Sequence, residues 1–166
     1  RFKLDLLNVI LGEGMSSRLF IEVRDKLGLA YSVQSYAEHF LDTGAMTVSA
    51  GVDNKNIKVA VKAILHELAR LKEDISEAEL NKSKELFKGR IWLRMEDSRS
   101  VAGWNGSQEI LTGGILSIDE VIGIIDAITA DEMMELAREL LVGDKIRLAA
   151  VGPIDPDGNW EDLLKL

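Results

Sequence analysis

The placement of proline is the sequence feature that most constrains the fold of this chain. Both prolines, Pro153 and Pro156, lie beyond residue 152 of the 166-residue sequence. Proline breaks helices and interior strands because it lacks an amide hydrogen and fixes the backbone angle φ. The first 152 residues can therefore form long regular elements without a proline break.

Apolar spacing and capping signals predict that helices dominate. From Asn54 to Lys72, apolar residues recur at steps of three and four with charged residues between them, which is typical of an amphipathic helix. Ser76, Ser117 and Thr129 each precede a glutamate by three residues, which is the spacing of a capping box. These signals predict helices over residues 54–72, 77–95, 117–125 and 129–142, with a shorter helix within 98–111.

Strands are expected in fewer places. Tyr31–Phe40 and Ala45–Val52 predict a hairpin, because Gly44 between them can take the left-handed conformation that a hairpin loop needs. Ile146–Val151 is a short apolar run that predicts a third strand in the interior. Leu4–Leu11 is apolar enough for a buried helix, although its length also allows a strand.

Composition excludes several classes of function. With 28 acidic and 20 basic residues the net charge is -8, so we expect no basic surface for nucleic-acid phosphates and no attraction to anionic lipid. No apolar run reaches the roughly 18 residues that a membrane span needs. The absence of cysteine excludes disulfides, thiolate zinc sites and cysteine nucleophiles, and leaves the compartment open. The expected partners therefore include neither nucleic acid nor a membrane.

The two histidines, His39 and His66, each stand beside a glutamate, so a zinc site has to be weighed. Residues 66–70 (HELAR) begin like H-E-x-x-H, but Arg70 stands where the second ligand belongs, and a guanidinium cannot bind a cation. Residues 35–39 (SYAEH) end like the inverted motif H-x-x-E-H, but serine replaces the first histidine, and residues four apart in a strand are about 13 Å from each other. We therefore expect two surface histidines and no metal site in this chain.

Residues 12–17 (GEGMSS) resemble the start of a dinucleotide-binding loop, G-x-G-x-x-G, with Ser17 in place of the third glycine. A glycine turn between two helices explains the pattern equally well. A Rossmann site also needs a preceding strand and alternating parallel strands, whereas the next strands here form a hairpin. A phosphate- or nucleotide-binding domain is therefore a third alternative for the function.

The segment from Leu11 to Val33, LGEGMSSRLFIEVRDKLGLAYSV, carries the most specific motif. It places a glycine pair before Ser-Arg-Leu-Phe, then a helix with Glu22 and Arg24, then Gly-Leu-Ala-Tyr-Ser ending at residue 32. This arrangement resembles the second domain of pitrilysin-type zinc metallopeptidases, the inverzincin group that includes insulysin and the mitochondrial processing peptidase. The resemblance covers about residues 6–153, because further motifs follow in the order that the family has: DTG at 42–44, SEAEL at 76–80, TADE at 129–132 and AVGP at 150–153.

The resemblance implies that the catalytic zinc lies outside this chain. In the family, zinc is held by H-x-x-E-H and a downstream glutamate in one domain, and a similarly folded partner domain closes over it. The helix around Asp5–Leu11 matches the place of the metal-binding helix but contains no histidine. We therefore expect no cofactor in this chain, zinc in a catalytic domain or subunit that is its partner, and a peptide as substrate.

Arg24 and Tyr31 are the supporting catalytic and substrate-binding residues that the resemblance implies. In the family, the matching arginine and tyrosine reach toward the metal and contact the region of the scissile bond. A guanidinium is permanently charged and a phenol donates one hydrogen bond, so the pair can hold a substrate carbonyl and stabilise an oxyanion. The ordinary alternatives are an ion pair of Arg24 with Glu22 or Asp25, and a Tyr31 ring that packs in its strand.

Gly12 and Gly14 match the glycine-rich loop that the non-catalytic subunit of the mitochondrial processing peptidase uses in substrate handling. The loop is much shorter here. We therefore interpret both glycines mainly as turn residues, and substrate binding as the role that the resemblance implies for them.

The elements and the resemblance together predict an α+β fold, a mostly antiparallel sheet with helices layered on one side. We expect residues 1–153 to form one domain of a longer protein, because the chain begins at Arg1 rather than methionine, and residues 154–166 to form a tail with one helical turn near Trp160. The implied function is the metal-free domain of a zinc-dependent endopeptidase. The alternative is a non-catalytic structural or interaction domain. Strands before Leu4 are expected to be missing, which leaves an open sheet edge and favours self-association.

Overall fold

The structure, a computed structural model, describes residues 1–155 and 158–164, so Pro156 and the end of the expected tail lie outside the described residues. Within the described residues, no helix combines the length and the apolar character needed to cross a membrane. The elements, in chain order, are α1 (Phe2–Gly12), the π-helix η1 (Phe20–Lys26), β1 (Ala30–His39), β2 (Gly44–Val52), the 3-10 helix η2 (Asn54–Asn56), α2 (Ile57–Arg70), α3 (Glu77–Arg94), α4 (Ser98–Thr112), α5 (Ile118–Ala127), α6 (Ala130–Leu140) and the 3-10 helices η3 (Gly143–Lys145) and η4 (Glu161–Leu164).

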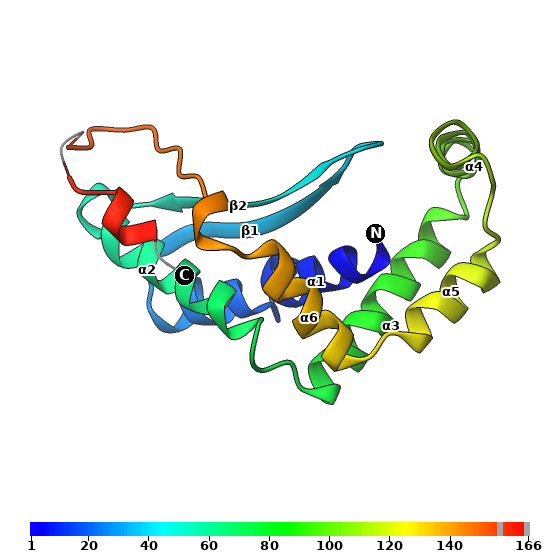
Figure 1. Cartoon of the computed structure of the whole chain (residues 1–166), viewed down its shortest axis with the longest axis horizontal. Helices are drawn as coiled ribbons and strands as arrows, with labels where there is room; N and C mark the ends of the chain where they lie inside the picture. The colour runs from blue at the N-terminus through cyan, green and yellow to red at the C-terminus, as the bar shows by residue number, and fades with distance from the viewer. Residues whose placement is uncertain (156–157, 165–166) are drawn as a thin grey trace.

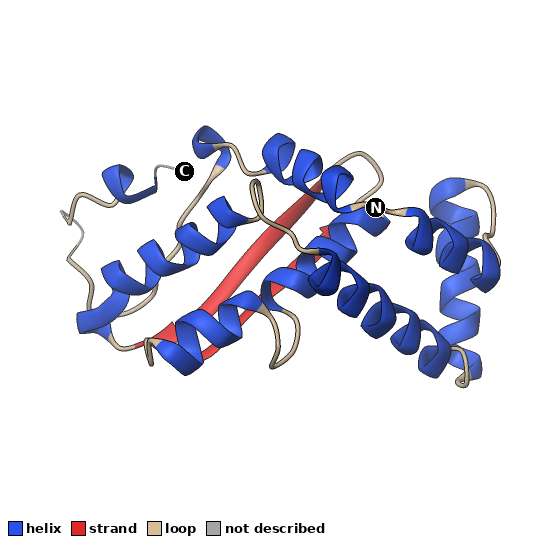
Figure 2. Cartoon of the chain, turned by 90° about the horizontal axis from the view of Figure 1, so that it is seen from below, coloured by secondary structure: helices blue, strands red, loops and turns tan. Residues whose placement is uncertain are grey.

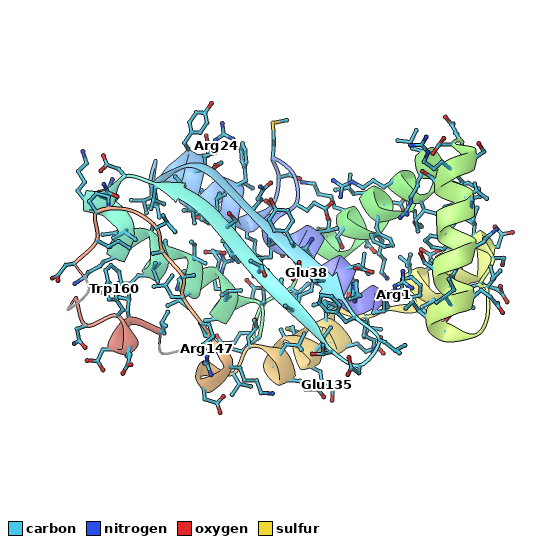
Figure 3. The ribbon with its side chains drawn as sticks, turned by 90° about the horizontal axis from the view of Figure 1, so that it is seen from above. Arg1, Arg24, Glu38, Glu135, Arg147 and Trp160 are labelled. Carbon is cyan, nitrogen blue, oxygen red and sulfur yellow. The ribbon has the colours of Figure 1, made fainter. Side chains whose placement is uncertain are left out.

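The two strands form an antiparallel sheet with helices on one of its faces. In Figure 1 the sheet lies above α1, α2 and α6, and Figure 2, seen from below, places these helices in front of the strands. Side chains of β1 alternate between the buried and the exposed face, with Val33 and Ser35 buried against the helices. The opposite face is left open in the view from above (Figure 3). The predicted α+β class, with helices layered on one side of an antiparallel sheet, is confirmed.

Helix α1 lies at the centre of the core. Leu6, Leu7 and Leu11 are fully buried, and α1 contacts β1, α3 and α6. A helix that is apolar around most of its circumference has to be covered on several sides, which explains why the run from Leu4 to Leu11 shows no clear period. The structure therefore assigns that run to a helix rather than a strand.

The capping signals explain where the later helices begin. Ser117 and Thr129 form complete capping boxes, in which the hydroxyl accepts from the third helical amide and the glutamate accepts from the capping residue's amide. At Ser76 the box is half formed. The Ser76 hydroxyl accepts from the amide of Glu79, but the Glu79 carboxylate is bound to Arg18 instead. A tertiary ion pair has replaced the second half of the local motif.

The predicted third strand is wrong for the described structure. Residues 146–151 form no regular element and pair with no strand among the described residues, whose sheet holds β1 and β2. A groove lies between them and β2, and it is lined by residues 43–50, by residues 145–149 and by Val61, Ile64 and Leu68 of α2. An apolar run can become a strand only where a second backbone is within hydrogen-bonding reach, and here the groove lies between the two.

The role predicted for Gly44 is also wrong. Gly44 does not have the positive φ expected for the hairpin loop. A side chain at this position would instead place its Cβ 2.6 Å from the carbonyl oxygen of Glu38 on the facing strand. Glycine is required at the start of β2 because the two backbones approach closely, not because the loop is left-handed.

Candidate functional site

A π-helical turn positions Arg24. The helix that follows the glycine loop widens over Phe20–Lys26, where the amide of Leu27 donates to the carbonyl of Glu22 five residues earlier at 3.1 Å. Gly28 then takes φ +59°, a left-handed conformation that ends the helix and turns the chain toward β1. Single π-helical turns are rare and are found frequently at functional sites.

A β-bulge positions Tyr31. Ala30 pairs with Val52 and Ser32 pairs with Gly51, so Tyr31 is an extra residue between two consecutive pairs of the ladder. Bulges bend the strand and redirect a side chain, and they are common next to active sites. The Tyr31 side chain is 87% exposed. The two irregular backbone segments of this region therefore each present one residue of the motif to solvent.

The structure brings Arg24 and Tyr31 together. The guanidinium carbon of Arg24 lies 5.8 Å from the centroid of the Tyr31 ring and 4.7 Å from the centroid of the Phe20 ring. Both distances are within the range of about 6 Å in which a cation is attracted to an aromatic face. Figure 3 shows Arg24 at the surface, projecting from η1 away from the body of the molecule. This site therefore presents an exposed cation flanked by two aromatic rings.

Two ordinary alternatives, an ion pair of Arg24 with a neighbouring carboxylate and a Tyr31 ring packed in its strand, do not match the geometry. Glu22 pairs with Lys26, at 2.6 Å, rather than with Arg24. Within the described part of the chain, the Arg24 guanidinium has no carboxylate partner and the Tyr31 hydroxyl has no hydrogen-bond partner. Both groups are therefore available to a ligand.

The two glycines of the loop before η1 have different roles, one in packing and one in a turn. Gly12 is buried at the end of α1, where a Cβ would lie 2.5 Å from the amide nitrogen of Ser35. Gly14 has φ +92° and open space around it, and its carbonyl accepts from the Ser17 hydroxyl at 2.7 Å. Met15, at the tip of the loop, is 78% exposed. The loop follows a helix rather than the strand that a dinucleotide-binding loop requires, which argues against the nucleotide alternative.

Arg18, which the sequence did not single out, occupies a buried ion-pair network. It is 5% exposed; its guanidinium donates to both carboxylate oxygens of Glu79, at 2.7 and 2.8 Å, and to the backbone carbonyl of Asp74. Burial opposes ionisation of Glu79, but the hydrogen bond and charge of Arg18 outweigh it, so the pKa of Glu79 lies below its ordinary value. This network fixes the helical segment that leads into η1 against the start of α3.

The residues of this chain do not fit a zinc site. His39 bonds to Asp5 at 2.7 Å, and His66 is exposed on α2. Glu67 is buried and pairs with Arg70, the residue that replaces the second histidine of the zinc motif, at 3.1 Å. Across residues 1–155 and 158–164, no three histidine, cysteine or acidic side chains are grouped closely enough to hold a metal ion.

Comparison with known proteins identifies the family. Residues 1–87 match the family described as the peptidase M16 inactive domain. The zinc protease YmxG of Bacillus subtilis (strain 168) is 38% identical over 159 residues, which is 95% of this chain. The chain belongs to the M16 peptidase family. Its match is to the inactive domain, and the matched residues include Arg24, Tyr31 and both loop glycines.

Solved structures have the same fold as this chain. A conserved protein from Enterococcus faecalis V583 has a TM-score of 0.77 and 31% identity, covering 82% of this chain and 32% of that chain. The M16 inactive domain from Pseudomonas fluorescens has a TM-score of 0.76 over 84% of this chain and 34% of that chain; at 20% identity it shows the fold alone. This M16 domain spans 38% of the length of YmxG.

Proposed function

We propose that this M16 domain is the metal-free domain of a zinc-dependent endopeptidase and supplies Arg24 and Tyr31 as contacts to the peptide near the bond that is cut. Residues 1–153 would be one domain of a longer polypeptide, with the catalytic zinc domain in the same polypeptide or in a partner subunit. Membership of the M16 family and the zinc-protease relatives support this proposal.

One observation carries the proposal. The Arg24 guanidinium is exposed and faces aromatic rings, and no carboxylate among the described residues neutralises it. A cation without a protein counterion attracts an anion or a developing negative charge. The neighbouring phenol of Tyr31 adds a neutral hydrogen-bond donor. Together the two donors suit a peptide carbonyl whose oxygen becomes negative as the peptide bond is attacked.

Gly12 and Gly14 would contribute indirectly. Gly12 allows α1 to pack against β1, and the turn at Gly14 leads into the helix that carries Arg24. Met15, which follows Gly14, is exposed, and direct contact of the loop with the peptide is part of the proposal.

The test uses the assembled zinc protease with Arg24→Ala and the matched control Lys26→Ala. Lys26 is an exposed cation on the same helix that pairs with Glu22. We expect Arg24→Ala to lower kcat/KM by about 10²- to 10³-fold, the scale for loss of one oxyanion-hole donor, while zinc content stays unchanged. Lys26→Ala is expected to leave kcat/KM within about twofold, since exposed ion pairs contribute little. Equal losses in both variants would contradict the proposal.

A second experiment uses the isolated chain. Because its residues do not fit a zinc site, we expect metal analysis after dialysis against trace zinc to find well under one equivalent per chain and no peptide hydrolysis. Chelator-sensitive peptidase activity in the pure chain would contradict the assignment as a metal-free domain.

The second candidate is a non-catalytic interaction domain, favoured by the open edge of β2. The outer edge of this strand faces the groove and pairs with no strand in the described part of the chain. Unpaired strand edges attract other chains, so we expect the isolated domain to self-associate. Light scattering across a wide concentration range measures this association, and a strict monomer would contradict it. If Arg24→Ala leaves turnover unchanged in the assembled protein, this candidate replaces the catalytic one.

A further inference from the structure

The Phe20 ring also contacts Arg24, although it has no donor to offer a peptide. The Phe20 ring is the nearer of the two aromatic faces, at 4.7 Å from the guanidinium carbon against 5.8 Å for Tyr31. It lies four residues before Arg24 in η1, which is about one helical turn. The ring and the cation therefore project from the same side of one element.

The surroundings of the two rings differ. Phe20 is half-buried and follows Leu19, which is fully buried, so its backbone is fixed to the core. Tyr31 is 87% exposed at a bulge. Of the two rings, the Phe20 ring is the better anchored, and it provides a fixed face for the guanidinium.

An exposed arginine has to be held in one orientation to be effective in a site. A long flexible side chain loses rotamer freedom when it binds a ligand, and this loss weakens binding unless the side chain is already ordered. An arginine side chain is usually ordered by an ion pair with a carboxylate, as Arg18 is by Glu79. A carboxylate beside Arg24 would also neutralise the charge that the site uses. An aromatic face orients the guanidinium without neutralising it.

We propose that Phe20 is a positioning residue, whose ring holds the Arg24 guanidinium beside Tyr31 and leaves its charge available to the peptide. This inference rests on the proposed function. Phe20 acts through Arg24, so its effect disappears when Arg24 is absent.

The activity test is a double-mutant cycle in the assembled zinc protease. Phe20→Leu keeps an apolar side chain and removes the aromatic face, and we expect kcat/KM to fall about two- to fivefold, in keeping with an exposed cation–π contact. Phe20→Trp restores the face and is expected to restore kcat/KM. In the Arg24→Ala background, Phe20→Leu is expected to cause no further loss. The same loss in both backgrounds, or no recovery with tryptophan, would overturn the inference.

A readout independent of activity separates this inference from the proposed function. In the 166-residue chain, the Arg24 side-chain NMR resonances should show an aromatic ring-current shift that Phe20→Leu reduces, leaving the smaller contribution of the more distant Tyr31 ring, and that Phe20→Trp retains. If Phe20→Leu leaves these resonances unchanged, Phe20 does not position Arg24, whatever the kinetics show. If the resonances move as expected but Arg24→Ala leaves kcat/KM unchanged, the proposed function fails and the inference about positioning for catalysis fails with it.

Discussion

Arg18 and Arg24 lie six residues apart in one helical segment, and their environments are opposite. Arg18 is buried, donates to both carboxylate oxygens of Glu79, and joins the chain to a residue 61 positions away. Arg24 is exposed, has no carboxylate partner among the described residues, and faces the rings of Phe20 and Tyr31. The two residues have the same chemistry and are separated by less than two helical turns.

The difference separates two ways in which a protein uses arginine. A buried guanidinium is tolerated because a carboxylate compensates it, so Arg18 is part of the fold. An exposed guanidinium that is oriented by aromatic rings keeps its charge for a ligand. Stability and activity measurements on the same variants should therefore divide cleanly between the two positions.

The largest expected effect is on the fold. We expect Arg18→Ala to lower the free energy of unfolding by up to about 3 kcal/mol, because the half-buried Glu79 carboxylate and the Asp74 carbonyl lose their donor. Arg24→Ala is expected to change it by less than about 0.5 kcal/mol, as for an ordinary surface substitution. Urea denaturation of both variants of the 166-residue chain measures the two losses of unfolding free energy. Similar losses at the two positions would contradict the distinction between a structural Arg18 and an exposed Arg24.

The next effect tests whether the segment before η1 belongs to the fold. We expect Gly12→Ala to destabilise the chain by about 1 to 3 kcal/mol, because the added methyl group collides with the Ser35 backbone. Gly89 is the matched control, since it lies within α3 and a Cβ there meets nothing within 4 Å. Gly89→Ala is expected to stabilise by about 0.4 to 1 kcal/mol. Melting temperatures that change in the same direction for both variants would contradict the assigned packing role of Gly12.

The smallest effect concerns pH. The pKa of Glu79 is lower in the folded chain than its ordinary value of 4.5, so its ionised form stabilises the fold above that value and this contribution is lost as the pH falls through the folded pKa. We expect the stability difference between wild type and Glu79→Gln to be constant near neutral pH and to narrow below about pH 4.5. Thermal unfolding from pH 7 to pH 3 measures this difference, and a gap that widens toward acid would have the wrong sign.

The helices and the hairpin could be predicted because their signals are local. The capping boxes at Ser117 and Thr129 need four residues each, and the structure forms both. The strand predicted at residues 146–151 failed because pairing depends on a second backbone, which no pattern within the run can supply. The capping box predicted at Ser76 is only half formed for the same reason. Its glutamate, Glu79, is bound to Arg18, which lies in a distant part of the sequence.

The site could be predicted in part. Arg24 and Tyr31 were identified through the family motif, and their proximity fits the short connection between η1 and β1. Phe20 lies within the same motif, but its contact with Arg24 depends on how η1 winds and on how the chain packs, and the sequence pattern carries neither. The bulge at Tyr31 was missed because it is a property of two paired strands.

The Tyr31 hydroxyl gives the most direct test of the central claim, that this M16 domain supplies donors to the peptide rather than a scaffold alone. Tyr31→Phe removes one oxygen and keeps the ring, and Tyr36→Phe on the same strand is the matched control. In the assembled zinc protease we expect kcat/KM to fall about 10²- to 10³-fold for Tyr31→Phe alone, with unchanged zinc content and melting temperature, because the exposed hydroxyl has no partner in the described structure. Unchanged kcat/KM with a lowered melting temperature would assign Tyr31 to the fold and contradict the account.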